Sequence, residues 1–301
     1  MPRRFYTLDV FTSEVLTGNP LAVVLDAEGL DGERMQRIAR EFNLSETVFA
    51  AEPVKAEDRA SLRIFTPTRE LPFAGHPTVG TAVLLAILDR GGRPGEESFV
   101  LEEKVGLVPC AIEVASAERG RARFTLPRLP ERVDDLPDKA NLARALGLDP
   151  SAIGYGAHQP AVYSAGNAFG CVPLRDREAV TRARPRGEAF ADAFGGALNA
   201  GCYVYCADPI DPAHAYHARM FAPNAGIAED PATGSAAAAF AGVIMANDRP
   251  GDGEHSYVIE QGDAMGRPSR ITVSLSVVGN HLKQAMVGGG AVIVSEGHLR
   301  A

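Results

Sequence analysis

The chain has 301 residues, 46% of them hydrophobic and 23% charged, and this length favours two domains over a single core. Its net charge of −8 argues against nucleic-acid and anionic-membrane partners, but a pocket can still be locally positive and bind a small anion. The longest apolar stretches are shorter than the roughly 20 residues that span a bilayer. Asp9 and Glu14 precede any apolar signal region, so we expect a cytoplasmic protein.

The stretch FNLSETVFA contains a glutamate, Glu46, within a largely apolar run. Asp31 can cap a helix that ends near Asn43, because apolar residues recur between them at helical spacing. The apolar, β-branched residues that follow predict a strand, in which Glu46 shares one face with Leu44 and Val48. A glutamate at the start of a strand is usually solvated. This pattern alone therefore leaves a solvated and a functional Glu46 both open.

Three short segments of the first half recur in the second half in the same order. They are TGNPLAVVL and AGNAFGCVPL, RIFTP and RMFAP, and FAGHPTVGTAVLLAIL and DPATGSAAAAFAGVIM, which begin at Thr17 and Ala165, Arg63 and Arg219, and Phe73 and Asp230. The offsets are 166 − 18 = 148 for the glycines and 219 − 63 = 156 for the arginines. Such a repeat predicts two similar domains of about 150 residues, related by a pseudo-two-fold axis.

The helices that end the third pair of segments have no polar face, and such a helix must be buried all round. Short β-rich runs surround each of them, and RARFTLP opens the second set. We therefore expect an α+β fold of two pseudo-symmetric domains, each a curled mixed β-sheet around a central apolar helix. The polar helices KANLARALGL and PRGEAFADAFGGAL should lie outside. The expected domains are residues 1–120 with a C-terminal tail of about 280–301, and residues 121–279.

Each central helix begins at a glycine turn, where free backbone N–H groups and a partial positive charge can bind a carboxylate. Both N-termini can face one inter-domain cleft. His76 lies in the first turn, and Asp230 and Ser235 lie in the second. Ordinary helix caps explain the same turns, a lone histidine is more often structural, and Asp before Pro231 is common turn chemistry.

The sequence offers no metal or cofactor motif. CxxC, HExxH and GxxxxGK[ST] are all absent, so we expect no metal and no cofactor. Four cysteines in a chain of this length do not make a disulfide framework. Cys202 and Cys206 would share one face of a strand as small core residues.

Five segments resemble motifs of the PhzF family, the phenazine-biosynthesis isomerase-like proteins. They are GNPLAVVLD, NLSETVF, ELPFAGHPTVGTA, EDPATGSAAAA and EQGDAMGRPSRI, and the resemblance runs from about residue 5 to 297. It implies the diaminopimelate-epimerase-like fold and a homodimer, for which the many strand edges give weak independent support. It implies the catalytic residues Glu46, His76, Asp230 and Ser235 and the substrate-binding residues Gly75, Pro77, Thr233 and Gly234.

The resemblance implies a cofactor-independent isomerase that moves a proton on a small carboxylate-bearing metabolite. The family member that gives the name acts on trans-2,3-dihydro-3-hydroxyanthranilate. Desolvation beside aliphatic neighbours would raise the pKa of Glu46 toward the working pH, so that it can take and return a proton. The related epimerases use two cysteines, one in each glycine turn, and both turns lack cysteine here. The alternatives are an amino-acid racemase or epimerase without catalytic cysteines, and a non-catalytic metabolite-binding protein.

Overall fold

The computed structural model describes residues 2–196 and 201–300. The chain forms two compact units: unit 1 runs to Pro127 and resumes at Val287, and unit 2 is Arg128–Met286. Both boundaries lie seven residues later than the expected 120 and 280 (127 − 120 and 287 − 280). No helix among the described residues has the length and apolarity needed to cross a membrane.

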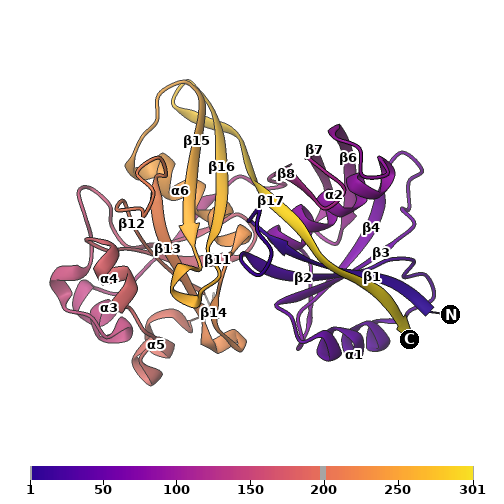
Figure 1. Ribbon diagram of the computed structural model, residues 1–301. Helices are drawn as coiled ribbons and strands as arrows, with labels where there is room; N and C mark the ends of the chain where they lie inside the picture. Colours follow the sequence, from indigo (N-terminus) through magenta and orange to yellow (C-terminus); the bar gives the residue numbers. More distant parts are fainter. Residues whose placement is uncertain (1, 197–200, 301) are drawn as a thin grey trace. The chain divides into compact units, whose positions relative to one another are not determined.

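Unit 1 is a mixed sheet packed around one helix, α2 (Figure 1). Its elements are β1 (Pro2–Val10), β2 (Asn19–Val24), α1 (Gly32–Phe42), β3 (Glu46–Ala51), β4 (Ala60–Phe65), β5 (Glu70–Leu71), α2 (Gly75–Asp89), β6 (Gly95–Glu103), β7 (Gly106–Val114), β8 (Arg119–Thr125) and most of β17 (His281–Arg300). Two pairs are parallel, β2 with β3 and β4 with β6. The pairs β1–β2, β3–β4, β6–β7, β7–β8 and β1–β17 are antiparallel.

Unit 2 repeats this scheme around α6. Its elements are β9 (Glu131–Asp135), α3 (Lys139–Leu146), the 3₁₀ turn η1 (Pro150–Ala152), β10 (Ala161–Ser164), β11 (Ala168–Pro173), α4 (Arg177–Arg182), α5 (Gly187–Phe194), β12 (Gly201–Cys206), β13 (Tyr216–Ala222), η2 (Pro223–Ala225), β14 (Ile227–Asp230), α6 (Gly234–Asn247), β15 (Gly253–Gln261), η3 (Asp263–Met265) and β16 (Ser269–Val278). Here β11–β12 and β13–β15 are parallel, and β10–β11, β12–β13 and β15–β16 are antiparallel. The predicted α+β fold with one apolar helix per domain is confirmed.

The two central helices have no solvent-exposed stripe along their length. Every residue of α2 from Gly75 to Ile87 is buried, and α6 is buried from Ala236 to Ile244. Close packing depends on a glycine in α2, since a Cβ on Gly80 would lie 2.6 Å from Leu21 and 2.7 Å from Val10 on the surrounding strands. An all-round apolar sequence is therefore matched by all-round enclosure, as predicted.

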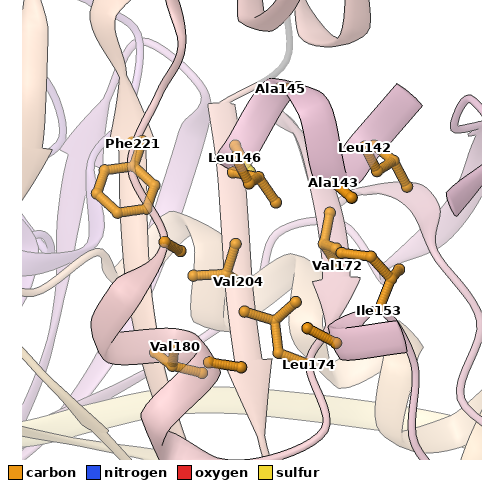
Figure 2. Close-up of a cluster of buried hydrophobic side chains, with 14 of the residues drawn as sticks. Leu142, Ala143, Ala145, Leu146, Ile153, Val172, Leu174, Val180, Val204 and Phe221 are labelled. Atoms are coloured by element: carbon orange, nitrogen blue, oxygen red, sulfur yellow. The ribbon is translucent and has the colours of Figure 1, made fainter. Parts of the chain in front are cut away.

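Amphipathic helices cover the other face of each sheet. In unit 1 the cap of α1 is as predicted, with the Asp31 carboxylate accepting a hydrogen bond from the Arg34 N–H at 2.8 Å and Asn43 ending the helix at φ 50°. Figure 2 shows the equivalent layer of unit 2, where Leu142 and Leu146 of α3 lie against the strand residues Val172 and Val204. These layers hold the strands that carry the candidate site.

The sequence repeat is also a repeat of one ion pair. Arg63 on β4 donates to Glu70 on β5 at 2.7 and 2.9 Å, and Arg219 on β13 donates to Glu229 on β14 at 2.7 and 2.8 Å. These are the arginines of RIFTP and RMFAP. In each unit the pair joins two neighbouring strands just before the central helix.

Two segments differ from the sequence expectation. Residues 121–127, expected to open the second domain, contribute to β8 of unit 1, because a short turn joins β8 back to β7 in an antiparallel hairpin. The helix expected over residues 185–198 is α5, Gly187–Phe194. The predicted positions Ala197 and Leu198 lie outside the described residues.

Candidate active site

Glu46 is the first residue of β3 and pairs in parallel register with Leu21 of β2. Its side chain is only 12% exposed, and its Oε2 atom lies 3.2 Å from Nε2 of His76. The following residues of β3, Thr47 to Ala50, are buried. Glu46 is therefore a carboxylate at the margin of a core, in contact with an imidazole and largely removed from water.

His76 lies in the first turn of α2 and is 4% exposed. Burial lowers the pKa of His76 to about 3, although a hydrogen bond to the backbone of Pro20 acts in the opposite direction. Asn19, which is fully buried, places its side-chain amide 3.4 Å from Nδ1 of the ring. At neutral pH the imidazole is therefore uncharged, and it can accept or donate a proton without carrying a permanent charge.

The start of α2 has no side-chain cap. The N-cap residue is Ala74, which has no side chain that could bond the first N–H groups of the helix. Gly75 and His76 are the first two helical residues, and Pro77 follows at a position where the lack of an N–H costs little. The positive end of the helix dipole lies beside the Glu46–His76 pair.

In unit 2 the predicted residues gather at the start of α6. Asp230 ends β14 and is buried, and its Oδ2 accepts a 2.6 Å hydrogen bond from the Thr233 hydroxyl. Thr233 is the N-cap of α6, Gly234 is its first residue, and Ser235 is a half-buried residue of the first turn. The positive end of the helix dipole thus lies next to the side chain of Asp230.

Gln261, at the end of β15, holds this turn in place. Its amide nitrogen donates to the Asp230 carbonyl at 2.8 Å and to the Thr233 hydroxyl at 3.0 Å. Its amide oxygen accepts from the Thr233 N–H at 3.2 Å and from the Tyr203 hydroxyl at 3.3 Å. All the hydrogen-bonding capacity of this buried amide is directed to positioning the candidate site.

Each unit therefore gathers its own share of the predicted residues. In unit 1, Glu46 lies beside His76 at the end of α2 that also carries Gly75 and Pro77. In unit 2, the start of α6 brings together Asp230, Thr233, Gly234 and Ser235. A common cleft for the two groups stays a prediction. Sequence reasoning gave no role to Asn19 and Gln261, although both lie in the segments GNPLAVVLD and EQGDAMGRPSRI that carry the family resemblance.

The repeat is asymmetric at the position of Glu46. Leu21 pairs with Glu46, and Phe169, 148 residues after Leu21, pairs with Gly201 at the same place in unit 2. Gly201 is therefore the structural counterpart of Glu46. The two repeats provide one carboxylate at this strand position instead of two.

One group of side chains in the described part of the chain has metal-ligand spacing: His217, Glu260 and Asp263. Both oxygens of Glu260 are occupied, by the N–H groups of Ile210 at 2.6 Å and Asp211 at 2.9 Å and by two histidine rings. These hydrogen bonds account for the buried carboxylate without an ion. The expectation of no metal stays a prediction.

The four cysteines are buried and unpaired, as expected for core residues. Burial raises the pKa of all four thiols, Cys110, Cys171, Cys202 and Cys206. None of them lies in the first turn of α2 or α6. A racemase mechanism with two thiolates therefore has no candidate residues among them.

Solved structures place the fold in a known class. Hydroxyproline epimerase from Agrobacterium vitis aligns with 99% of this chain and 92% of its own, at a TM-score of 0.61 and 14% identity, which shows the fold alone. The chain thus has the diaminopimelate-epimerase-like fold, the class expected from sequence.

Residues 8–297 match the PhzC-PhzF family, described as phenazine biosynthesis-like protein, and the chain belongs to this family. An uncharacterized isomerase of Mesorhizobium japonicum is 48% identical, covering 99% of this chain and 98% of that protein. Trans-2,3-dihydro-3-hydroxyanthranilate isomerase of Pseudomonas aeruginosa is 36% identical, with 98% of each chain covered. The structure of a PhzF-family protein from Bacillus anthracis covers 100% of both chains at a TM-score of 0.88 and 29% identity. The protein is an isomerase of the PhzF family.

Proposed function

We propose that this protein is a cofactor-independent isomerase that moves a proton between two carbons of a small carboxylate-bearing metabolite, with Glu46 as the acid/base. The observation that carries the proposal is the 3.2 Å approach of the Glu46 carboxylate to His76 in a nearly water-free setting. A base held out of water can have its pKa raised toward neutrality, which suits it to both halves of a proton shift.

The other predicted residues have supporting roles in this proposal. The substrate carboxylate would bind at the uncapped helix starts near Gly75 and Gly234, where backbone N–H groups attract an anion. His76, uncharged because of its burial, would orient the substrate and share a proton with Glu46. Asp230, fixed by Thr233, and Ser235 would contact polar groups of the substrate. The protein would act as a cytoplasmic homodimer.

The proposal is tested by replacing Glu46 with Gln, which keeps the shape of the side chain but cannot hold and release a proton. Transfer of deuterium from D₂O is measured on trans-2,3-dihydro-3-hydroxyanthranilate, the substrate named for the Pseudomonas aeruginosa relative, and on a panel of amino acids. Exchange should fall by about 10²–10⁴-fold, the usual contribution of one general acid–base group. Full exchange by a stably folded variant would refute the role of Glu46.

The same measurements separate the alternatives. A racemase would exchange the α-proton of an amino acid, whereas the proposed isomerase would label a different carbon of its product. If a compound binds measurably but none of the compounds exchanges a proton, a metabolite-binding protein would be favoured. The matched control is Glu41→Gln on the exposed surface of α1, which should leave exchange unchanged.

A further inference from the structure

A second buried glutamate lies at the start of α2. Glu103 ends β6 and is 8% exposed, and its Oε1 lies 2.7 Å from the hydroxyl of Thr78 in the first turn of α2. Its other oxygen, Oε2, is buried and has no hydrogen-bond partner among the described residues. The isomerase mechanism proposed above makes no use of this carboxyl group.

The number of protons available for hydrogen bonding shows whether the carboxyl group of Glu103 is protonated. The Thr78 hydroxyl also lies 2.8 Å from the carbonyl oxygen of Ala74, the N-cap of α2. A hydroxyl has a single proton to donate, and a carbonyl oxygen can only accept. If Thr78 donates to Ala74, the short contact between Thr78 and Glu103 requires a proton on the carboxyl group.

The internal repeat supplies an independent comparison. Ser61 of β4 pairs with Glu102 of β6, and His217 of β13, 156 residues later, pairs with Glu260 of β15. The residues that follow, Glu103 and Gln261, are therefore counterparts. Gln261 is a neutral amide that bonds Thr233, the N-cap of α6, through both its oxygen and its nitrogen.

The residues that precede this pair, Glu102 and Glu260, also make equivalent hydrogen bonds. Glu102 accepts the N–H groups of Val54 at 2.8 Å and Lys55 at 2.9 Å. Glu260 accepts the N–H groups that lie 156 residues further along the chain, those of Ile210 and Asp211. One glutamate of each unit therefore caps a loop as an anion, and the next residue faces the start of the central helix.

We propose that Glu103 is a positioning residue, which as a neutral carboxylic acid donates to Thr78 and so fixes the turn of α2 that carries Gly75 and His76, as Gln261 fixes the start of α6. The consequence for catalysis rests on the proposed function. Protonated, Glu103 completes a chain of donors from its own O–H through Thr78 to the Ala74 carbonyl. Ionised, it would place an unpaired charge in the core and draw the Thr78 proton away from Ala74.

The charges around Glu103 agree with a neutral form. Burial raises the pKa of Glu103 to about 8, and the contact with the Thr78 hydroxyl lowers it only in part. On the neighbouring β7 and α2, Cys110 is a buried thiol and His76 is uncharged at neutral pH. The other titratable groups of these two elements are Glu113, which is exposed, and Asp89, which is bound to Arg59 at 2.7 Å. The adjacent Lys104 directs its charge away, to Glu70 at 2.7 Å.

The first test compares the wild type with Glu103→Gln by urea unfolding from pH 5 to 8.5. The folded carboxyl titrates near 8 and the unfolded one near 4.5, so the folded chain holds one extra proton between these values. The stabilisation is complete below about pH 4.5 and is lost as the pH rises to about 8. The folding equilibrium constant of the wild type should thus fall about tenfold per pH unit relative to the variant. A pH-independent ratio would overturn the proposal.

The matched control is Glu102→Gln on the same strand. Backbone N–H groups of Val54 and Lys55 hold the pKa of Glu102 below its usual value. Its stabilisation is therefore present above about pH 4.5, and this variant should lose stability at neutral pH, the opposite of Glu103→Gln. Two neighbouring glutamates with opposite pH dependence would exclude a general effect of lost charge.

A spectroscopic measurement covers the case in which Glu103→Gln does not fold. The wild type at pH 7 should show the infrared carbonyl band of a protonated carboxylic acid, which should disappear as the pH rises past about 8. If the Glu103→Gln variant does fold, its spectrum should lack this band. A wild-type spectrum without it at pH 7 would overturn the proposal by itself.

The positioning role is read from amide hydrogen exchange. Glu103→Ala should speed exchange of the Thr78 and Val79 amides in the first turns of α2, and Glu103→Gln should restore slow exchange. Ala237, which holds the Thr78 position in α6, is the internal control and should not change. Unchanged exchange at Thr78 in Glu103→Ala would refute positioning. These readouts need no substrate, so they decide the role of Glu103 even if the proposed proton transfer is wrong.

Discussion

The duplicated arginines allow one prediction with a built-in comparison. Arg219→Met and Arg63→Met each remove a guanidinium and keep much of the side-chain bulk. Arg219 is 3% exposed, whereas Arg63 is 35% exposed. The two ion pairs occupy the same place in their units, so burial and the number of partners are the main differences between them.

The structure gives unequal magnitudes for the two changes. Arg219 binds Glu229 through two nitrogens, and its third, Nη1, lies 2.9–3.0 Å from the carbonyl oxygens of Val180, Thr181 and Ala183 at the end of α4. Removing one partner of such a buried pair costs about 3–5 kcal/mol. The loss of Arg63 leaves Glu70 bound to Lys104 at 2.7 Å and should cost about 0–1 kcal/mol.

Urea unfolding followed by far-ultraviolet circular dichroism measures both variants, since the chain contains no tryptophan for fluorescence. Urea leaves ionic strength unchanged, so it does not screen the charges under test. Arg219→Lys should recover little stability, because an ammonium cannot replace the two-pronged contact together with the carbonyl contacts. An equal cost for Arg219→Met and Arg63→Met would refute the reasoning.

Four further predictions concern packing, pH, cofactors and assembly. Gly80→Ala should lower the stability of the protein by about 1–3 kcal/mol, because the added Cβ would lie 2.6 Å from Leu21 and 2.7 Å from Val10; an unchanged melting temperature would contradict this. Burial raises the pKa of Glu260, but hydrogen bonds led by the Asp211 N–H hold it below its usual value. The stability difference between wild type and Glu260→Gln should therefore be full above about pH 4.5 and shrink on acidification, and a constant difference would contradict it. Treatment with EDTA should leave deuterium exchange unchanged, and a loss restored by a divalent ion would show that a metal is needed. Light scattering at micromolar concentration should give a dimer mass, and a monomer mass would count against the homodimer.

Elements whose own composition permits only one environment could be predicted from sequence. A helix such as VGTAVLLAIL has no face that tolerates water, so enclosure by a sheet follows from its composition. The same holds for the start of β3, where Asn43 ends a helix and β-branched residues follow. Glu46 accordingly begins β3, and it lies 3.2 Å from His76. Their catalytic roles remain a proposal.

The role of Glu103 could not be predicted from its surroundings in the chain. The strand GEESFVLEE contains four glutamates, and nothing local distinguishes the buried Glu103 from the exposed Glu96. The contact of Glu103 with α2 involves Thr78, 25 residues earlier in the chain. Gln261 and Asn19 are similar cases, because the side-chain partners described above lie 28 to 58 residues away. Such contacts become visible only once the fold is known.

The pairing of β1 with β17 has a consequence for the order in which the chain can fold during synthesis. Pro2 pairs with Arg300 and Val10 with Ala291, so the two ends of the chain meet on neighbouring strands (Figure 1). On the ribosome, unit 2 is a continuous segment and can complete its sheet as soon as Met286 has emerged. Unit 1 begins earlier in the chain but cannot complete its sheet until β17 has emerged, because β1 lacks one neighbouring strand before then. Translation therefore favours the completion of unit 2 before unit 1, the reverse of their order in the gene.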